Sequence, residues 1–111
     1  MKIVRVIYTT TKEFADTNSR NIRGVIAELK ELAHPGISYS AYLSDDGKTF
    51  MHFDQFENDA AHQLLVSLAS FKKFDRELLG SGLEMEPRLD VLKLVGSTET
   101  FFAGTAGAKI E

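Results

Sequence analysis

The sequence of 111 residues predicts one α+β domain whose elements follow in the order βαββαβ. Segments rich in β-branched and aromatic residues alternate with segments whose apolar residues have helical spacing. Two of the strand-like segments flank an Asp-Gly pair, which is typical of a β-hairpin. The chain has the length of a single domain, so one hydrophobic core is expected.

The first half of this order is a strand followed by a helix. Lys2–Thr10 (KIVRVIYTT) is rich in β-branched residues and is the expected strand. The polar run Asp16–Asn18 supplies N-cap candidates for the helix, and apolar residues follow at helical spacing. We expect this helix to end at His34, because Pro35 disfavours helical geometry in the residue before it.

The middle of the chain predicts a hairpin. Its strands are Ile37–Ser44 and Thr49–Phe56, and Asp46 and Gly47 in the turn between them can accept positive φ angles. The hairpin is antiparallel, so its two strands lie side by side in the sheet.

The second half predicts a helix and a final strand. Asn58 or Asp59 is expected to cap the helix, which should break near Ala69-Ser70 and end at Gly80.

We expect the last strand at Arg88–Val95, because Pro87 should delay its start. Together these elements predict a ferredoxin-like domain over residues 1–97, with a four-stranded antiparallel sheet and helices on one face. Residues 98–111 read as a C-terminal tail, although Phe101 and Phe102 are costly to leave in water.

The composition excludes several classes of function. A formal charge of -3 disfavours binding to nucleic-acid phosphates or to an anionic membrane. The absence of cysteine excludes disulfides, zinc thiolates and cysteine nucleophiles, and His34, His52 and His62 have no metal-ligand spacing. We therefore expect no metal and no cofactor. No segment approaches a membrane span or a secretion signal, which indicates a cytoplasmic protein.

The strands are apolar on both faces. In the first strand Val4, Val6 and Tyr8 lie on one face, while Ile3 and Ile7 lie on the other. Two helices can cover one face of such a sheet, and the other would expose a large apolar patch. Face-to-face pairing of two sheets in a homodimer would bury that patch.

Four segments carry a resemblance to a known family: KIVRVIYTT, NIRGVIAELKELAHPG, ISYSAYLSDDGKTFMHFDQFEND and LLVSLASFKKFDREL. Over Lys2–Ser97 the chain resembles the antibiotic-biosynthesis-monooxygenase-like superfamily of dimeric α+β barrels. The resemblance implies a homodimer with a ligand cleft between each sheet and its helices. Members include cofactor-independent oxygenases of aromatic substrates, haem-degrading enzymes and proteins without known activity. A small aromatic ligand is the partner that this resemblance implies.

Two departures from the family reduce the number of activities that the resemblance implies for this chain. The haem-degrading members look recognisable by a Trp together with an Asn and a His, and this chain has no Trp. Many members carry a His in the second helix about a turn and a half before the aromatic-rich segment. That position is Leu65 or Val66 here, and His62 lies one turn too early to take its role.

One polar constellation can be built from the hairpin. A turn centred on Asp46-Gly47 places Tyr39 opposite Asp54, and His52 lies two residues from Asp54 on the same face. The hypothesis is that His52 acts as a base, its pKa raised by the carboxylate, while Tyr39 and Asp54 orient a phenolic or enolic substrate. The expected apolar rim of the pocket consists of Leu43, Phe50 and Phe56.

Three alternatives remain open at this point. The constellation could be a satisfied polar cluster in the barrel wall or the dimer interface, since buried polar groups usually exist in that state. The protein could then be a non-enzymatic ligand-binding or stress-associated dimer. An RNA-recognition-type domain shares the βαββαβ order, but its third strand should read basic-Gly-aromatic-small-aromatic, and Lys48–His52 (KTFMH) does not.

Overall fold

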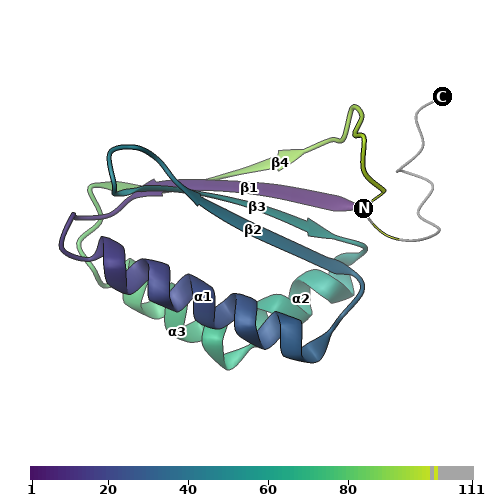
Figure 1. Cartoon of the computed structure of the whole chain (residues 1–111), viewed down its shortest axis with the longest axis horizontal. Coiled ribbons are helices and arrows are strands. Elements are labelled where there is room, and N and C mark those ends of the chain that lie inside the picture. Colours follow the sequence, from purple (N-terminus) through teal and green to yellow (C-terminus); the bar gives the residue numbers. More distant parts are fainter. Residues whose placement is uncertain (101, 103–111) are drawn as a thin grey trace.

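A computed structural model describes residues 1–100 and residue 102 as a four-stranded antiparallel sheet with three helices on one face (Figure 1). The strand order is β2-β3-β1-β4. The predicted ferredoxin-like α+β fold class is confirmed, with the second helix in two parts. The elements are β1 (Lys2–Thr9), α1 (Ala15–Leu32), β2 (Ile37–Leu43), β3 (Thr49–Phe56), α2 (Asp59–Ser67), α3 (Ala69–Leu79) and β4 (Met85–Leu92).

The start of α1 differs from the prediction. The helix begins at Ala15, and Phe14 occupies the N-cap position without a side-chain cap. The turn before the helix already binds the Phe14 N–H, which donates to the carbonyl and to the hydroxyl of Thr11. The predicted caps Asp16–Asn18 therefore lie inside the first turn, where Asn18 is buried in the core.

The end of α1 also differs from the prediction. The helix ends at Leu32 and not at His34. Ala33 adopts a left-handed conformation with φ of 50°, and its N–H donates to the carbonyls of Leu29 and Lys30. This backbone cap satisfies the last turn and ends the helix before the steric effect of the following proline is felt.

The hairpin forms as predicted, with one difference in its turn. Gly47 has the positive φ, at 74°, but Asp46 does not. The Asp46 carboxylate instead accepts hydrogen bonds from the backbone N–H groups of Lys48 and Thr49, both at 2.9 Å. This side-chain cap holds the turn, and with it the register of β2 against β3.

The two short helices meet at an extended residue. Asn58 caps α2 by accepting the N–H of Ala61 at 2.9 Å, as predicted. The chain straightens at Leu68, whose ψ is 140°, so the break lies one residue before the predicted pair. The start of α3 is bound from α1, because Glu28 Oε1 accepts from the N–H and the hydroxyl of Ser70.

The last strand begins earlier than predicted. β4 starts at Met85, although Arg88–Val95 was expected, and Pro87 lies inside it. β4 is an edge strand paired with β1 alone, and their register shifts between Ile7 and Thr9. An edge strand with such an irregularity tolerates a proline, because the missing N–H removes no ladder hydrogen bond.

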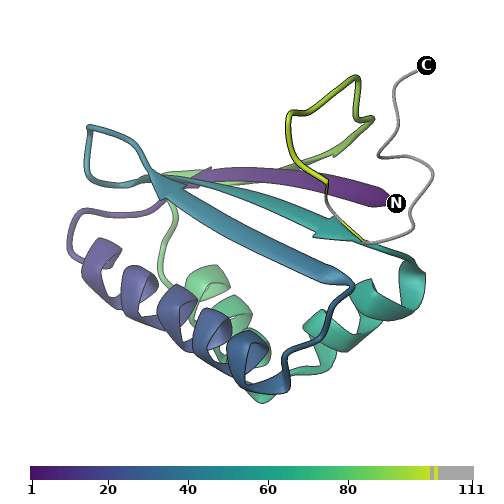
Figure 2. The ribbon, with the colours of Figure 1, turned by 45° about the vertical axis from the view of Figure 1, so that its right-hand side comes forward.

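The core lies between the sheet and the helices (Figure 2). The sheet contributes alternate residues of β1 and β3, and the helices contribute their apolar faces. Its most buried members include Tyr8, Phe56, Val25 and Leu65. Phe102 is also buried at 7% exposure, whereas Phe101 and most of the predicted tail lie outside the described residues.

The opposite face of the sheet carries a mixture of side chains. Ile7, Met51 and Phe53 are half-buried there. Arg5 pairs with Asp90 at 3.0 Å on the same face. Within the described part of the chain, no helix combines the length and the apolarity needed to cross a membrane.

β4 extends beyond the cover of the helices. Leu89 lies opposite Val6 and Val91 lies opposite Val4, so both side chains are on the helix-facing side of the sheet. They are nevertheless 60% and 68% exposed. The helices therefore cover β2, β3 and β1 but leave this edge open.

Candidate functional site

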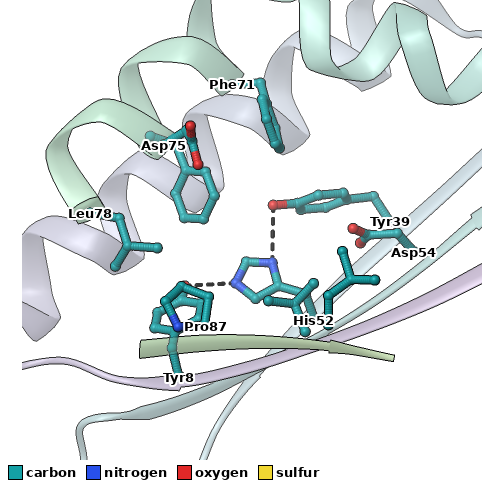
Figure 3. A pocket seen from close by; sticks show the side chains of 11 residues that line it. Tyr8, Tyr39, His52, Asp54, Phe71, Asp75, Leu78 and Pro87 are labelled. Atoms are coloured by element: carbon teal, nitrogen blue, oxygen red, sulfur yellow. Dashed lines mark hydrogen bonds between the residues drawn. The ribbon is translucent and has the colours of Figure 1, made fainter. Parts of the chain in front are cut away.

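A cavity of about 210 Å³ lies between the sheet and α3 (Figure 3). It is smaller than the roughly 300–1,000 Å³ of common ligand pockets, and larger than the roughly 150 Å³ that holds a benzene molecule. A ligand of one or two aromatic rings matches this volume. The cavity is lined by Val6, Tyr8, Tyr39, His52, Asp54, Phe71, Phe74, Asp75, Leu78, Pro87 and Leu89.

The hairpin brings the three predicted site residues together. In the observed register Tyr39 pairs with Asp54, and Ala41 pairs with His52, as the position of the turn predicts. Because side chains alternate along a strand, Tyr39, His52 and Asp54 all lie on the helix-facing side. All three line the cavity.

The apolar wall is not the predicted one. Leu43 is 47% exposed at the end of β2, and Phe50 and Phe56 are buried elsewhere in the core. The wall opposite the sheet comes from α3, where Phe74 packs against the His52 ring with centroids 5.4 Å apart. The other apolar residues that α3 contributes are Phe71 and Leu78.

Both ring nitrogens of His52 are hydrogen-bonded to tyrosines. Nε2 lies 2.7 Å from the Tyr8 hydroxyl, and Nδ1 lies 3.2 Å from the Tyr39 hydroxyl. Figure 3 shows the two phenols on opposite sides of the imidazole. Asn18 extends the chain, because its Nδ2 donates to the Tyr8 hydroxyl at 2.8 Å.

Tyr8 and Asn18 are not among the site residues that the sequence predicts. Tyr8 shares a face of β1 with Val4 and Val6, so its hydroxyl had to find a partner inside the core. This need for a hydrogen-bond partner in the core is a sequence feature from which Tyr8 could have been predicted as a member of the polar cluster. The sequence predicts Asn18 as a cap candidate, and nothing in its neighbourhood indicates that it contacts Tyr8, ten residues earlier on β1.

Burial shifts the pKa values of the polar residues in the cavity wall. It lowers the pKa of His52 to about 4, which is opposite to the expectation that a carboxylate raises it. It raises the pKa of Asp54 to about 7, and it raises the pKa values of Tyr8 and Tyr39 above their ordinary range. At neutral pH the imidazole and both phenols are neutral, and Asp54 is the group that titrates.

Asp54 also carries an unpaired atom. Its Oδ1 is buried without a hydrogen-bond partner in the described residues. Buried carboxylate oxygens are normally hydrogen-bonded, so an unpaired Oδ1 favours the protonated, uncharged form of the Asp54 carboxyl group.

The other two histidines lie outside the cavity. His62 stacks on Phe56 with ring centroids 4.4 Å apart, and its Nδ1 lies 3.0 Å from Lys2 Nζ. His34 Nδ1 accepts the backbone N–H of Gly36 at 3.0 Å. Over the residues that the structure describes, no group of three His, Asp or Glu side chains is placed to hold a metal ion.

No protein-family model matches the sequence, and no curated protein matches it. Solved structures do match. A crystal structure of antibiotic biosynthesis monooxygenase is 12% identical with a TM-score of 0.72, and the match covers 86% of this chain and 99% of that one. Rv0793 from Mycobacterium tuberculosis is 15% identical with a TM-score of 0.73, covering 88% and 98%. PA3566 from Pseudomonas aeruginosa is 22% identical with a TM-score of 0.68, covering 82% and 90%.

Proposed function

We propose that this chain, which has the fold of antibiotic biosynthesis monooxygenase, binds a small aromatic or phenolic molecule in the cavity and oxidises it without a cofactor. The observation that carries the proposal is the state of Asp54. Asp54 lines the cavity, and burial raises its pKa to about 7, so its carboxylate is able to accept a proton at neutral pH. The aromatic wall formed by Phe71 and Phe74 suits an aromatic ring.

The reaction begins with proton transfer. Asp54 takes a proton from a phenolic or enolic hydroxyl, and the resulting anion is electron-rich enough to react with dioxygen. Dioxygen forms a new C–O bond at a ring carbon that carries hydrogen, and the proton held by Asp54 returns to the outer oxygen, which gives a hydroperoxide. Loss of water leaves a carbonyl group, so that in the keto tautomer of the substrate a CH₂ centre and O₂ become C=O and H₂O.

In this proposal the base is Asp54, and not His52 as the sequence predicts. The imidazole has a pKa of about 4 and both of its nitrogens are hydrogen-bonded, so it is a poor base at neutral pH. His52 instead positions Tyr39, whose hydroxyl orients the substrate oxygen. The three proposed site residues thus remain Tyr39, His52 and Asp54.

Oxygen uptake tests this function. The purified protein is given hydroquinones and naphthohydroquinones, which have one or two rings, and uptake is compared with uncatalysed oxidation. We expect turnover that falls by about 100-fold or more in Asp54→Asn, as for loss of a general base. Asp16→Asn, at an exposed position in the first turn of α1, is the matched control and should keep full turnover.

Loss of turnover in His52→Ala, with the fold intact, would support the positioning role. Equal turnover by the Asp54→Asn variant and the unaltered chain would refute the proposed base.

One observation favours a second candidate, a non-enzymatic ligand-binding protein. The hydrogen bonds with Tyr8 and Tyr39 satisfy both nitrogens of His52, as in a structural polar cluster. This reading is supported if 2-naphthol binds in the cavity and no member of the panel causes oxygen uptake.

We further propose that the protein is a homodimer that pairs through its sheets. The open face carries Ile7, Met51 and Phe53, and the uncovered edge carries Leu89 and Val91. Pairing of two sheets through the open face would bury the first group, and exposed apolar residues on a small domain are typical of an association surface.

A further inference from the structure

The hydrogen bonds around His52 form a chain from Asn18 through Tyr8 and His52 to Tyr39. The donor and the acceptor of each bond can be deduced by starting at Asn18. Asn18 is 0% exposed, and its Nδ2 lies 2.8 Å from the Tyr8 hydroxyl oxygen. An amide nitrogen carries donors and no acceptor, so the Tyr8 oxygen must accept this bond. The reverse orientation of the amide would bury an unpaired NH₂ group in place of the unpaired Oδ1, and orphaned N–H groups are the rarer of the two.

The direction of the next bond follows. The Tyr8 hydroxyl has one hydrogen, and its second polar contact is His52 Nε2 at 2.7 Å. Asn18 Nδ2 cannot accept, so in the described residues Nε2 is the acceptor within reach of this buried hydrogen, and Tyr8 donates to Nε2. Nε2 of His52 therefore carries no hydrogen.

The tautomer of His52 is thereby determined. A neutral imidazole has a single N–H, and burial keeps this ring neutral at physiological pH. With Nε2 as acceptor the hydrogen lies on Nδ1, which donates to the Tyr39 oxygen 3.2 Å away.

The last step leaves one hydrogen unassigned. The Tyr39 oxygen accepts from His52, so its own hydroxyl hydrogen is free to rotate toward the cavity that Tyr39 lines. In the residues that the structure describes, His52 supplies the hydrogen bond found for this hydroxyl. Asp54 lies opposite Tyr39 across the hairpin, but its Oδ1 has no hydrogen-bond partner in the described residues and so does not accept this hydrogen.

We propose that Asn18 and Tyr8 are positioning residues that hold His52 in the Nδ1–H tautomer, so that Tyr39 donates a hydrogen bond to an acceptor oxygen of the ligand. The ligand class that this selects is a one- or two-ring aromatic compound with a carbonyl or phenolate oxygen. This assignment of ligand rests on the proposed function, because it places the ligand in the same cavity. The tautomer itself does not depend on any activity.

The tautomer is read from the ¹⁵N chemical shifts of the histidine ring in the uniformly labelled full chain at pH 7.5. The three histidines are told apart with His34→Gln and His62→Gln. We expect His52 to show protonated Nδ1 and unprotonated Nε2. The opposite pattern would overturn the proposal without reference to any substrate.

Two variants test whether Tyr8 is responsible. Tyr8→Phe removes the donor to Nε2, so a population with Nε2 protonated should appear. Tyr42→Phe makes the same change at an exposed tyrosine of β2 and should leave the His52 shifts unaltered. An unchanged tautomer in Tyr8→Phe refutes the positioning role. If that variant fails to fold, Asn18→Ala is measured instead and is judged by the same outcomes.

Binding tests the ligand class. α-Tetralone and tetralin are bicyclic and differ in one carbonyl group, so their affinities isolate the acceptor. We expect the ketone to bind about tenfold more tightly, as for one hydrogen bond to a partly buried donor. The preference should disappear in Tyr39→Phe and shrink in Tyr8→Phe, while Tyr42→Phe retains it.

The proposed monooxygenase function and the proposed ligand class can be refuted independently of each other. Equal affinity for the ketone and the hydrocarbon in the unaltered chain would refute the ligand class, whatever the oxygen uptake. A clear ketone preference with the Nδ1–H tautomer, but without oxygen uptake, would refute the monooxygenase and leave this inference intact.

Discussion

Asp54 determines how this protein should respond to pH. It is 8% exposed, and burial raises its pKa to about 7. The residues that face the cavity beside it are Tyr8, Tyr39, His52 and Asp75. Both phenols and the imidazole are neutral at pH 7, so the Asp54 charge has no cationic partner in this wall.

Between about pH 4 and pH 7 the stability of Asp54→Asn should change less with pH than that of the unaltered chain. Below about pH 4 Asp54 is protonated in both states, and as pH rises to 7 the unfolded chain alone has lost the proton. Folding stability from this group is thus present at low pH and lost through pH 7, by roughly 4 kcal/mol in total. Urea unfolding of both proteins at pH 4, 6 and 8 measures this loss of stability.

The free energy of unfolding of Asp54→Asn should therefore rise relative to that of the unaltered chain as pH rises from 4 to 7. The opposite contribution of His52, whose lowered pKa costs stability as pH falls below 6.5, is common to both proteins and largely cancels in the difference. Asp16→Asn serves as the control and should follow the unaltered chain. A constant difference between Asp54→Asn and that chain at all three pH values would contradict the raised pKa.

The sequence predicts part of the site because strand geometry is simple. An Asp-Gly turn fixes the register of the hairpin, and the period of two then places Tyr39, His52 and Asp54 on one face. The partners Tyr8 and Phe74 come from other elements, so their approach depends on tertiary packing. The direction of the His52 pKa shift depends on burial, which local spacing does not reveal.

At the scale of elements, α1 and α3 are joined by polar contacts as well as apolar packing. Asn21 donates to Glu77 Oε1 at 2.9 Å near one end of the pair. Near the other end, Glu28 accepts from the N–H and hydroxyl of Ser70. Glu28 thereby acts as an N-terminal cap for α3, which has no side-chain cap of its own.

Replacing Glu28 by Ala should destabilise the fold by about 1 kcal/mol, the usual cost of losing a helix cap. The first turn of α3 would lose an acceptor and a favourable negative charge. Chemical unfolding of Glu28→Ala and of Glu31→Ala, an exposed glutamate on the same helix, gives the comparison. Equal losses in the two variants would show that the contact with Ser70 contributes nothing.

Element boundaries were predicted less well than element order. The alternation of strand and helix patterns is strong enough to give βαββαβ. The true ends depend on contacts that sequence spacing does not show, such as the turn at Thr11 before α1 and the left-handed Ala33 after it. Pro87 was read as a barrier to β4, because its place at a sheet edge was not visible.

At the scale of the whole molecule, the paired-sheet dimer makes a direct prediction. Phe53 lies on the open face, edge-to-face with Tyr42 at 6.0 Å between ring centroids. Phe53→Lys would place a positive charge in the proposed interface, beside the like charge of its strand partner Arg5. Sedimentation at micromolar concentration should give twice 12.4 kDa for the unaltered chain and about 12.4 kDa for the variant.

Lys72→Glu, on the exposed side of α3, provides the control and should sediment with the unaltered chain. A single species near 12.4 kDa for the unaltered chain would rule out the dimer.

The position of β4 has a consequence for motion. This strand contributes Pro87 and Leu89 to the cavity wall, yet one ladder to β1 holds it, and no helix covers its exposed residues. Edge segments with few buried contacts open at a small fraction of the global unfolding free energy. In a single chain, amide hydrogens of β4 should thus exchange with solvent sooner than those of β3. A molecule could then reach Tyr39 by fraying of this edge while the rest of the core stays closed.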